Sequence, residues 1–397
     1  MHRSCRCVSC ITPPHILKRL LQSSDADVRD AALSTLLTTA ELRGERIVRA
    51  SMASTLSSSP SDGSRTIFDC RNRRILQVAR RVRTETGPAS SDETVNRAFD
   101  GLGATRNFYK EILQRNSIDG RGMRLDAYVH FSRKYNNAFW NGQSMVFGDG
   151  DGKIFTDFTK SLDVIAHELA HGVTENTAGL EYHDQPGALN ESISDVFGSL
   201  VKQWTLKQSA AEADWLIGAE ITTPAIQADA LRSMKAPGTA YNNALLGEDP
   251  QPDHMSKYVQ LPDTEEGDWG GVHINSGIPN KAFFLVATKL GGYAWEAPGH
   301  IWYESLKAST PDTVFQEFAD TTWVKAGQLY GTGGAQQQAV AAAWGEVGVR
   351  TGTGPTPMPV EARGDSLAAL ASRIEALSAQ IQTLTTEITV LRDDLNS

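Results

Sequence analysis

The chain has 397 residues, of which 40% are hydrophobic and 21% charged, and its formal net charge is −9 at pH 7. This length and composition are typical of a globular protein with more than one structural unit, and they exclude a fibrous or disordered chain. The negative charge predicts no nucleic-acid partner, and no apolar stretch is long enough to predict a membrane span.

Residues 1–50 are predicted to form a small separate unit. The head is rich in cysteine and proline and carries basic residues, but no apolar run follows them, so we predict no secretory signal peptide. Two short helices are expected where apolar residues recur at helical spacing, over residues 16–21 and 28–42. Residues 51–64 are serine-rich, which predicts an exposed linker. The protein is therefore expected to be cytoplasmic, or exported by a route that needs no signal peptide.

Near residue 160 the sequence pattern changes from β-rich runs to a helical period. Residues 65–160 contain β-rich runs separated by glycine and aspartate turns, which predicts an α+β lobe. The β-rich runs are residues 66–68, 125–131 and 144–147. Residues 161–350 follow a helical period, for example over 162–174 and 280–289, which predicts a second, mainly helical lobe. The predicted fold class is α+β.

A linker rich in glycine, threonine and proline is predicted over residues 351–364, and residues 365–397 repeat apolar side chains every seven positions. The a positions are Leu367, Ile374, Ile381, Ile388 and Leu395, and the d positions are Leu370, Leu377, Leu384 and Leu391. Isoleucine at a with leucine at d favours a parallel two-stranded coiled coil, which predicts a homodimer. A trimer or a pairing with another protein stays open, because the e and g positions carry few charges.

The motif that carries chemistry is His167-Glu168-Leu169-Ala170-His171, inside a predicted helix. Histidines four residues apart share one helix face, so both imidazoles can bind the same metal ion. Glu168 lies on a neighbouring face, from which it can act as a base on a water at the metal. Taken alone, the motif also fits two structural histidines on a solvated helix face.

A third ligand and supporting groups follow downstream. Glu191, at the predicted start of another helix, completes a set of two histidines and one glutamate, which is typical of catalytic zinc. Asp195, one turn later, is placed to accept a hydrogen bond from the outer nitrogen of a ligand histidine, although an ordinary helix carboxylate would give the same pattern. Asp268 and His273 flank a glycine turn and are predicted to act as orienting acid and proton donor.

Residues 65–349 resemble the thermolysin family of neutral metallopeptidases, and in particular its protealysin-like branch with a short N-terminal propeptide. The matching segments are residues 137–140, 145–152, 167–171, 177–180, 190–195, 231–234 and 270–277. The resemblance implies a two-lobe zincin with the active-site helix between the lobes. The zinc ligands it implies are His167, His171 and Glu191. It also implies that Glu168 is the catalytic base, that Tyr182 and His273 stabilise the transition state, and that Asp268 orients His273.

The same resemblance implies how a peptide substrate binds. Asn137 and the Ala138 carbonyl would bind the substrate backbone as an edge strand does, and Arg232 would contact the carbonyl of the residue after the cut. The side-chain pocket for that residue would be lined by Phe155, Phe158, Val164, Ile217 and Leu231. Each of these could equally be ordinary core, but as a pocket they predict cleavage before bulky apolar residues. The expected activity is that of a zinc-dependent endopeptidase acting on proteins or peptides.

The chain departs from the family at its paired calcium site. Only Asp163 and Asp214 stand at matching positions, whereas Lys202, Leu216 and Ala219 replace other ligands. Two carboxylates beside a lysine do not supply the roughly six to eight oxygens that calcium requires. We therefore expect the paired calcium site to be absent, or to be at best a single weak one.

Residues 1–50 resemble the short propeptide of the protealysin-like branch, which implies a zymogen whose active site is masked until the linker over residues 51–64 is cut. The candidate inhibitory residues that this resemblance implies are Cys10, Pro13 and Pro14, which precede the first predicted helix. One hypothesis is that an N-terminal cysteine binds the zinc as a thiolate, and the other is plain steric blocking.

Two other functions compete with an endopeptidase. The first is an inactive protease-like scaffold that acts through its coiled-coil tail; against it, every implied catalytic position is intact. The second is a zinc aminopeptidase that shares the two-histidine motif; against it, no amine-recognition motif is found in the sequence.

Overall fold

In the computed structural model, the residues that the structure describes are 9–52 and 63–352. The chain divides into one unit that ends at Gly352 and a second that begins at Thr353. The predicted coiled coil over residues 365–397 falls in the second unit, outside the described residues. None of the helices described is both long enough and apolar enough to cross a lipid bilayer.

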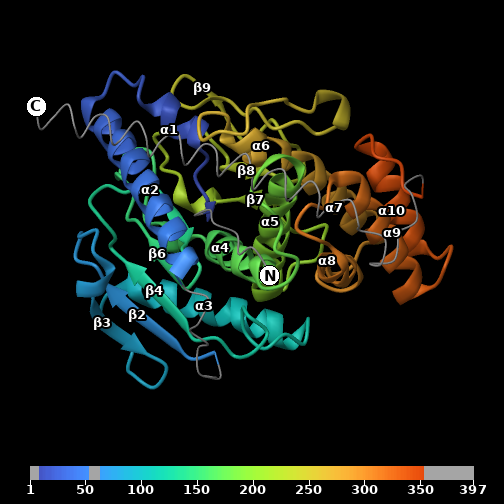
Figure 1. Ribbon diagram of the computed structural model, residues 1–397, viewed down its shortest axis with the longest axis horizontal. Coiled ribbons are helices and arrows are strands. Elements are labelled where there is room, and N and C mark those ends of the chain that lie inside the picture. The colour runs from blue at the N-terminus through green and yellow to red at the C-terminus, as the bar shows by residue number, and fades with distance from the viewer. Residues whose placement is uncertain (1–8, 53–62, 353–397) are drawn as a thin grey trace, which may run out of the picture. The chain divides into compact units, whose positions relative to one another are not determined.

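A six-stranded mixed sheet forms the first lobe of the described chain (Figure 1). Its strands are β1 (Ser9–Cys10), β2 (Arg65–Asp69), β3 (Arg80–Thr84), β4 (Leu125–Val129), β5 (Ala138–Trp140) and β6 (Ser144–Phe147). The spatial order is β1-β5-β6-β4-β2-β3, with β4 parallel to both β2 and β6 and the other pairs antiparallel. The edge beside β5 is therefore occupied by β1, which comes from the predicted propeptide.

The three predicted β-runs are present, but the second is shorter than predicted. Strand β4 ends at Val129, whereas the prediction extended to residue 131. His130 has φ of 52° and Ser132 has φ of 58°, so the backbone leaves the extended region at this point. Helix α3 (Glu93–Glu111), which begins with Asp92 as its N-cap, packs against β2 and β4.

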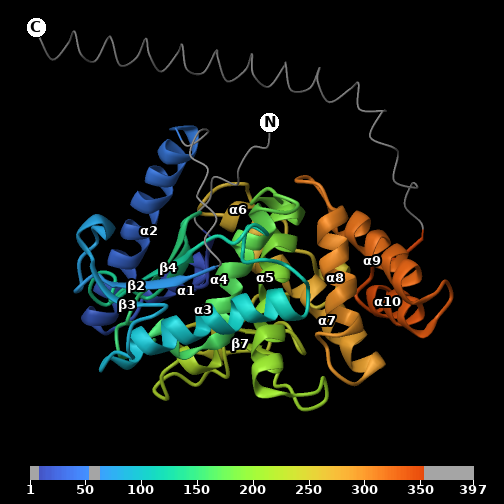
Figure 2. The same ribbon diagram turned by 90° about the horizontal axis from the view of Figure 1, so that it is seen from below.

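Helices form the second lobe and the centre of the molecule. They are α4 (Leu162–Glu175), α5 (Asp184–Leu206), α6 (Asp268–Asn275), α7 (Gly277–Leu290), α8 (Ala297–Ala308), α9 (Phe315–Tyr330) and α10 (Ala335–Glu346). Figures 1 and 2 both show α4 and α5 between the sheet and the group α7–α10. Nearly every residue of α4 is buried, as expected for a helix covered on all sides.

Short elements complete the fold. The strands are β7 (Leu216–Ile217), β8 (Arg232–Ser233), β9 (Asn242–Asn243) and β10 (Gly247–Glu248), and the 3₁₀ turns are η1 (Leu76–Val78), η2 (Phe158–Lys160), η3 (Ala219–Ile221) and η4 (Met255–Lys257). Strand β7 pairs with β8, which places Ile217 opposite Arg232.

Two helix limits differ from the predictions. Helix α5 begins at Asp184 and not at Asn190, because Pro186 and the acidic Asp184 suit a first helical turn. In the N-terminal unit, α1 (Pro14–Leu20) is short as predicted, but α2 (Ala26–Met52) continues well beyond residue 42. Asp25 starts α2 by accepting hydrogen bonds from the amides of the first turn.

Candidate metal centre and active site

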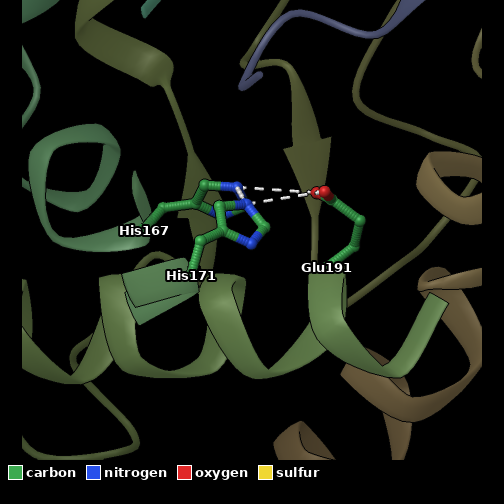
Figure 3. A group of neighbouring side chains, drawn as sticks. All are labelled: His167, His171 and Glu191. Atoms are coloured by element: carbon green, nitrogen blue, oxygen red, sulfur yellow. Dashed lines mark hydrogen bonds and ion pairs between the residues drawn. The ribbon is translucent and has the colours of Figure 1, made fainter. Parts of the chain in front are cut away.

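Three buried side chains converge between α4 and α5 (Figure 3). His167 and His171 lie one turn apart on α4, and Glu191 faces them from α5. The two Nε2 atoms are 3.0 Å apart. Each of these nitrogens is 3.5 Å from a carboxylate oxygen of Glu191. The spacing predicted from the sequence thus brings the three candidate ligands together.

The outer nitrogens of both histidines are already engaged. His167 Nδ1 lies 2.8 Å from Asp195 Oδ1, as predicted for Asp195. His171 Nδ1 lies 2.8 Å from the amide oxygen of Asn190 and 3.0 Å from Ser194 Oγ. Because a carboxylate and an amide oxygen only accept, each Nδ1 carries the proton and each Nε2 presents a lone pair. Two lone pairs then face each other, which is favourable only with a cation between them.

The chemistry of the donors fits zinc. Burial lowers the pKa of His171 to about 3, so this imidazole is neutral, the form in which histidine binds metals. Burial raises the pKa of Glu191, but His273 and the two candidate ligand histidines more than offset this and leave its pKa below the ordinary value. Glu191 Oε2 is buried without a hydrogen-bond partner among the described residues. Ligand atoms of a tetrahedral zinc site lie about 3.3 Å apart, close to the three distances found.

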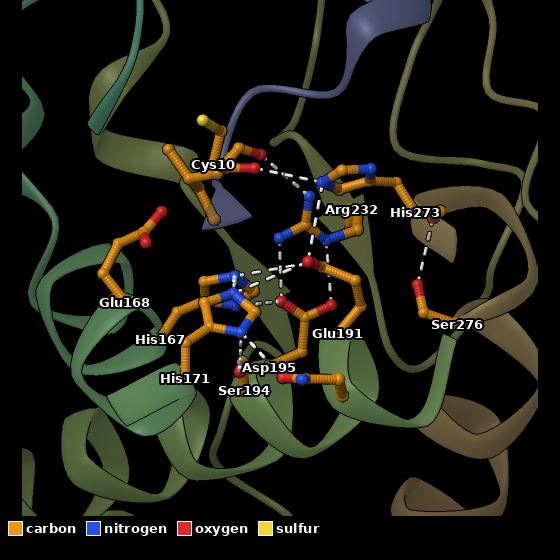
Figure 4. A network of polar contacts seen from close by, with 12 residues as sticks. Cys10, His167, Glu168, His171, Glu191, Ser194, Asp195, Arg232, His273 and Ser276 are labelled. Atoms are coloured by element: carbon orange, nitrogen blue, oxygen red, sulfur yellow. Dashed lines mark hydrogen bonds and ion pairs between the residues drawn. The ribbon is translucent and has the colours of Figure 1, made fainter. Parts of the chain in front are cut away.

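Glu168 follows the first ligand histidine along α4 but is not part of the ligand set. Its Oε2 accepts a hydrogen bond of 3.0 Å from the Trp140 amide at the end of β5. Burial first, and then the nearby charge of Glu191, raise the pKa of Glu168 well above its usual range. Figure 4 shows its carboxylate set apart from the ligand side chains. A carboxyl group with a raised pKa is suited to accept a proton and return it.

Tyr182 and His273 lie on the opposite side of the centre. The Tyr182 hydroxyl donates a hydrogen bond to Glu191 Oε1 and is 3.3 Å from His273 Nε2. His273 Nδ1 donates to Asp268 Oδ1 at 2.6 Å, and the His273 amide donates to Asp268 Oδ2. Burial opposes a charge on His273, but Asp268 and Glu191 raise its pKa to about 9. The ring is therefore held by Asp268 with a proton on Nε2 at neutral pH.

The glycine turn between Asp268 and His273 has a specific backbone. Asp268, Trp269, Gly270 and Gly271 all have positive φ, between 53° and 81°. The two glycines adopt this conformation without steric cost, while the two preceding residues are held in it by the surrounding structure. The turn brings the Asp268 carboxylate back to the amide and the ring of His273.

Arg232 lies behind the centre, on β8, where it pairs with Asp195. Its Nε and Nη2 donate to the two Asp195 oxygens, each at 2.8 Å. Burial raises the pKa of Asp195, but Arg232 and His167 more than compensate and hold it below its usual range. Asn280 Nδ2 donates a further bond of 2.8 Å to Asp195. One buried carboxylate therefore links the first ligand histidine to Arg232.

Two family descriptions match the chain. The catalytic domain of thermolysin metallopeptidases matches residues 62–175, and the α-helical domain of the same enzymes matches residues 178–349. Together they cover well over half of the 397 residues. The chain belongs to the thermolysin family of metallopeptidases. It is thus a metalloendopeptidase, and its α+β two-lobe zincin fold is confirmed.

Two bacterial proteases and one solved protease precursor are among the proteins most similar to this chain. Protease PrtS of Photorhabdus sp. (strain Az29) is 46% identical over 345 residues, which cover 86% of this chain and 92% of PrtS. An extracellular metalloprotease of Pectobacterium carotovorum subsp. carotovorum is 48% identical over 319 residues, 80% of this chain and 90% of the relative. The solved precursor of protealysin, a metalloproteinase from Serratia proteamaculans, gives a TM-score of 0.77 at 47% identity. The match covers 86% of this chain and 99% of the precursor's chain. The protealysin-like assignment is confirmed.

In this thermolysin-family chain, the N-terminal segment lies directly over the metal centre. Strand β1 pairs antiparallel with β5, placing Cys10 opposite Phe139. The Cys10 carbonyl oxygen accepts a hydrogen bond of 3.0 Å from His273 Nε2. The next residue, Ile11, donates its amide to the Ala138 carbonyl at 3.3 Å. The backbone of this segment therefore occupies the position where a peptide substrate is expected to bind.

The Cys10 side chain points away from the candidate ligands. Figure 4 shows its sulfur on the far side of the backbone from His167 and His171. The sulfur belongs to a small buried cluster whose other members are Cys70, Phe131, Tyr135, Phe139 and Val146. Burial raises the pKa of the Cys10 thiol to about 12, which favours the protonated thiol. At Cys10 the geometry favours blocking by backbone over a zinc thiolate; the other two N-terminal cysteines lie outside the described residues.

The two prolines end the extended segment and start α1. Pro13 has no amide hydrogen for further strand pairing and takes φ of −61° and ψ of 144° as N-cap, and Pro14 is the first residue of the helix. Both prolines are buried.

Helices α1 and α2 hold the N-terminal unit against the rest of the protein. Its contacts are His15 Nε2 to Tyr241 OH at 2.9 Å, Lys18 Nζ to the Glu266 carbonyl at 3.0 Å, Thr39 Oγ1 to Tyr135 OH at 2.9 Å, and Arg43 to Glu265 at 2.5 Å.

The residues predicted to line the pocket after the cut are fully buried. Phe155, Phe158, Val164, Ile217 and Leu231 belong to one continuous apolar cluster that also contains Ile11. The rings of Phe155 and Phe158 are 5.7 Å apart. Ile11 of the N-terminal unit is fully buried and belongs to this main core of the described chain.

Lys202 stands where the sequence analysis predicted the loss of calcium ligands. Its ammonium group is 3.1 Å from Asp163, 2.9 Å from Asp214 and 3.2 Å from Glu220. Burial disfavours its charge, but Asp163 and Glu220 more than compensate and raise the pKa of Lys202 above its ordinary value. Glu220 was not identified from the sequence. The lysine thus supplies a positive charge among carboxylates contributed by three separate segments.

Other supporting residues were also missed by the sequence analysis. Asn190 and Ser194, which hold His171, lie one residue before Glu191 and one before Asp195, so their helical spacing was an available signal. Asn280 reaches Asp195 from α7, and Gln251 Nε2 donates to the His273 carbonyl at 2.8 Å. The last two come from distant segments, and no local pattern marks them.

Proposed function

We propose that this chain is a zinc-dependent endopeptidase, made as a zymogen, that hydrolyses internal peptide bonds of proteins. The observation that carries the proposal is the extended backbone of the N-terminal unit, which lies on β5 with a carbonyl at His273, directly over the ligand set. A site that holds an extended peptide beside two histidines and a glutamate is suited to peptide hydrolysis.

The proposed roles follow from where the side chains lie. His167, His171 and Glu191 would hold zinc, which when bound acidifies water and polarises a carbonyl group. Glu168 removes the proton of the attacking water and passes it to the leaving nitrogen. Tyr182 and His273 donate hydrogen bonds to the oxygen of the carbonyl under attack, and a donor of this kind lowers the barrier by about 2.7–4 kcal/mol.

A second group of residues is proposed to position the substrate and the catalytic side chains. The Ala138 carbonyl and the Asn137 side chain align the substrate backbone, and Arg232 binds the carbonyl after the cut. Asp195 fixes both His167 and Arg232, and Asp268 fixes His273. Because Ile11 and the five residues predicted to line the pocket are all buried and apolar, a bulky apolar residue is expected after the cut.

The test is proteolysis of casein by the purified chain, with and without a zinc chelator, while mass spectrometry follows the N-terminus. We expect activity to disappear on chelation, to return with zinc, and to rise as residues up to the linker over 51–64 are lost. A chain that stays inactive after the linker has been cut would contradict the proposal and would favour the inactive scaffold.

We further propose that the helical lobe binds no calcium where the family's paired site lies. The support is Lys202, whose ammonium group lies within 3.2 Å of the acidic side chains there. An internal cation at this place would repel calcium while neutralising the same carboxylates.

The heptad repeat over residues 365–397 is proposed to make the protein a homodimer. The support is the unbroken series of isoleucine and leucine at the a and d positions. In sedimentation equilibrium of the Glu168→Ala chain, we expect twice the monomer mass for the full length and the monomer mass for a chain that ends at Arg350. Equal association states for the two chains would contradict the prediction, and a trimer would correct it.

The place of action stays a prediction, with the cytoplasm and the exterior of the cell as the two alternatives. A relative from Pectobacterium carotovorum is named an extracellular metalloprotease, which favours export. Immunodetection of the chain in washed cells and in culture medium distinguishes the two.

A further inference from the structure

The N-terminal segment lies in the active site with the direction of a substrate. Arg232 Nη1 donates to the Ile11 carbonyl at 3.1 Å, and the Thr12 amide donates to Asn137 Oδ1 at 3.0 Å. Under the proposed function, the carbonyl at Arg232 belongs to the residue after the cut, so Ile11 takes that position. The carbonyl before it, that of Cys10, then lies at the place of attack.

Both sides of the Cys10–Ile11 bond face the groups that would cleave it. The Cys10 carbonyl oxygen is 3.0 Å from His273 Nε2, the proposed donor to the carbonyl under attack. The Ile11 amide, which would become the leaving amine, points toward Ala138 and the Glu168 carboxylate. The Ile11 side chain is 0% exposed and suits the predicted preference for a bulky apolar residue after the cut.

From these contacts we infer that the Cys10–Ile11 bond is a self-cleavage site, hydrolysed within the same zymogen molecule before the linker is cut. This inference rests on the proposed function. One water is consumed, and its oxygen bonds to the Cys10 carbonyl carbon while the bond to the Ile11 nitrogen breaks. Glu168 carries a proton from that water to the nitrogen. The products are a peptide that ends in the Cys10 carboxylate and a chain that begins at the Ile11 amine.

The cleaved form stays latent. The chain after Ile11 remains attached through α1 and α2, which contact the body of the protein through His15, Lys18 and Arg43. The new amino terminus at Ile11 therefore stays where the product of a cut would lie, and it continues to exclude other substrates. Activation requires the separate cut in the linker, after which the rest of the N-terminal unit can dissociate.

In the first experiment, the full-length chain is purified in chelator, zinc is then added, and mass spectrometry follows the mass of the chain with time. We expect loss of the mass of residues 1–10, with a rate constant that does not change on dilution because the reaction is intramolecular. The Glu168→Ala chain is the matched control and should keep these residues. If linker-cut enzyme digests casein while the zymogen keeps an intact Cys10–Ile11 bond, the inference is wrong although the proposed function stands; if neither reaction occurs, both fail.

A second experiment tests the position of the segment without any turnover. Hydrogen exchange is measured by mass spectrometry on the full-length Glu168→Ala chain, with and without zinc. The amides of Ile11 and Thr12 should exchange far more slowly than in a free peptide, because each is buried and hydrogen-bonded. Asn137→Ala should speed exchange at Thr12 more than at Ile11. Exchange of both amides at the rate of a free peptide would overturn the assignment of Cys10–Ile11 to the place of attack.

Discussion

Replacement of Glu168 by alanine is expected to leave the metal bound and to reduce kcat/KM on casein, after linker cleavage, by at least about 10²–10⁴-fold. The reason is that Glu168 contributes no atom to the ligand set, while its carboxylate is the group placed to move the proton of the attacking water. Its Oε2 accepts a hydrogen bond of 3.0 Å from the Trp140 amide. Zinc content by atomic absorption and kcat/KM by casein hydrolysis measure the two effects.

Two variants make this prediction specific. Glu168→Gln keeps the shape of the side chain and the acceptor for Trp140, so its loss of activity isolates the proton transfer. Glu175→Gln, at the end of the same helix, removes a carboxylate that contacts the Trp140 indole nitrogen at 3.3 Å and should change the activity little. Retained casein cleavage by Glu168→Ala, or loss of zinc from it, would refute the assigned role.

The metal centre could be predicted from the sequence because its ligands follow from the spacing of residues close together in the chain. A helical period of 3.6 residues fixes His167 and His171 on one face whatever surrounds the helix, and only one further ligand had to be found. Glu191 was recognised from its own helix, even though that helix begins at Asp184 and not where the prediction placed it. An error in the start of a helix does not disturb the spacing inside it, so the ligand assignment was unaffected.

Contacts between distant segments could not be predicted in the same way. Asn280 lies 85 residues from Asp195 in sequence, and Cys10 lies 263 residues from His273. No periodicity connects such positions, because the pairing depends on the packing of whole elements. The glycine turn shows an intermediate case: the glycines indicated a turn, but the positive φ of Asp268 and Trp269 is imposed by tertiary structure.

Lys202→Met is expected to lower the free energy of unfolding by about 3–5 kcal/mol, because it leaves a buried charge without its partner. Asp163 is 0% exposed, and the Lys202 ammonium group is 3.1 Å from its Oδ2. Methionine fills a similar volume but carries no charge, so Asp163 would face the nearby carboxylates of Asp214 and Glu220 without compensation. Urea denaturation in the Glu168→Ala background avoids autolysis. Lys207→Met, beyond the end of the same helix and exposed, should change stability by about 0.5 kcal/mol or less.

Added calcium separates two effects of Lys202→Met on stability, namely the loss of the positive charge and the loss of side-chain packing. With the ammonium group removed, the carboxylates of Asp163, Asp214 and Glu220 offer oxygens to a divalent ion, and Ser161 Oγ is hydrogen-bonded to two of them. Added calcium should therefore raise the urea midpoint of Lys202→Met and leave that of the parent chain unchanged. A parent chain that calcium also stabilises would show that calcium is bound despite Lys202. If calcium fails to stabilise Lys202→Met, the lost lysine is needed for packing more than for its charge.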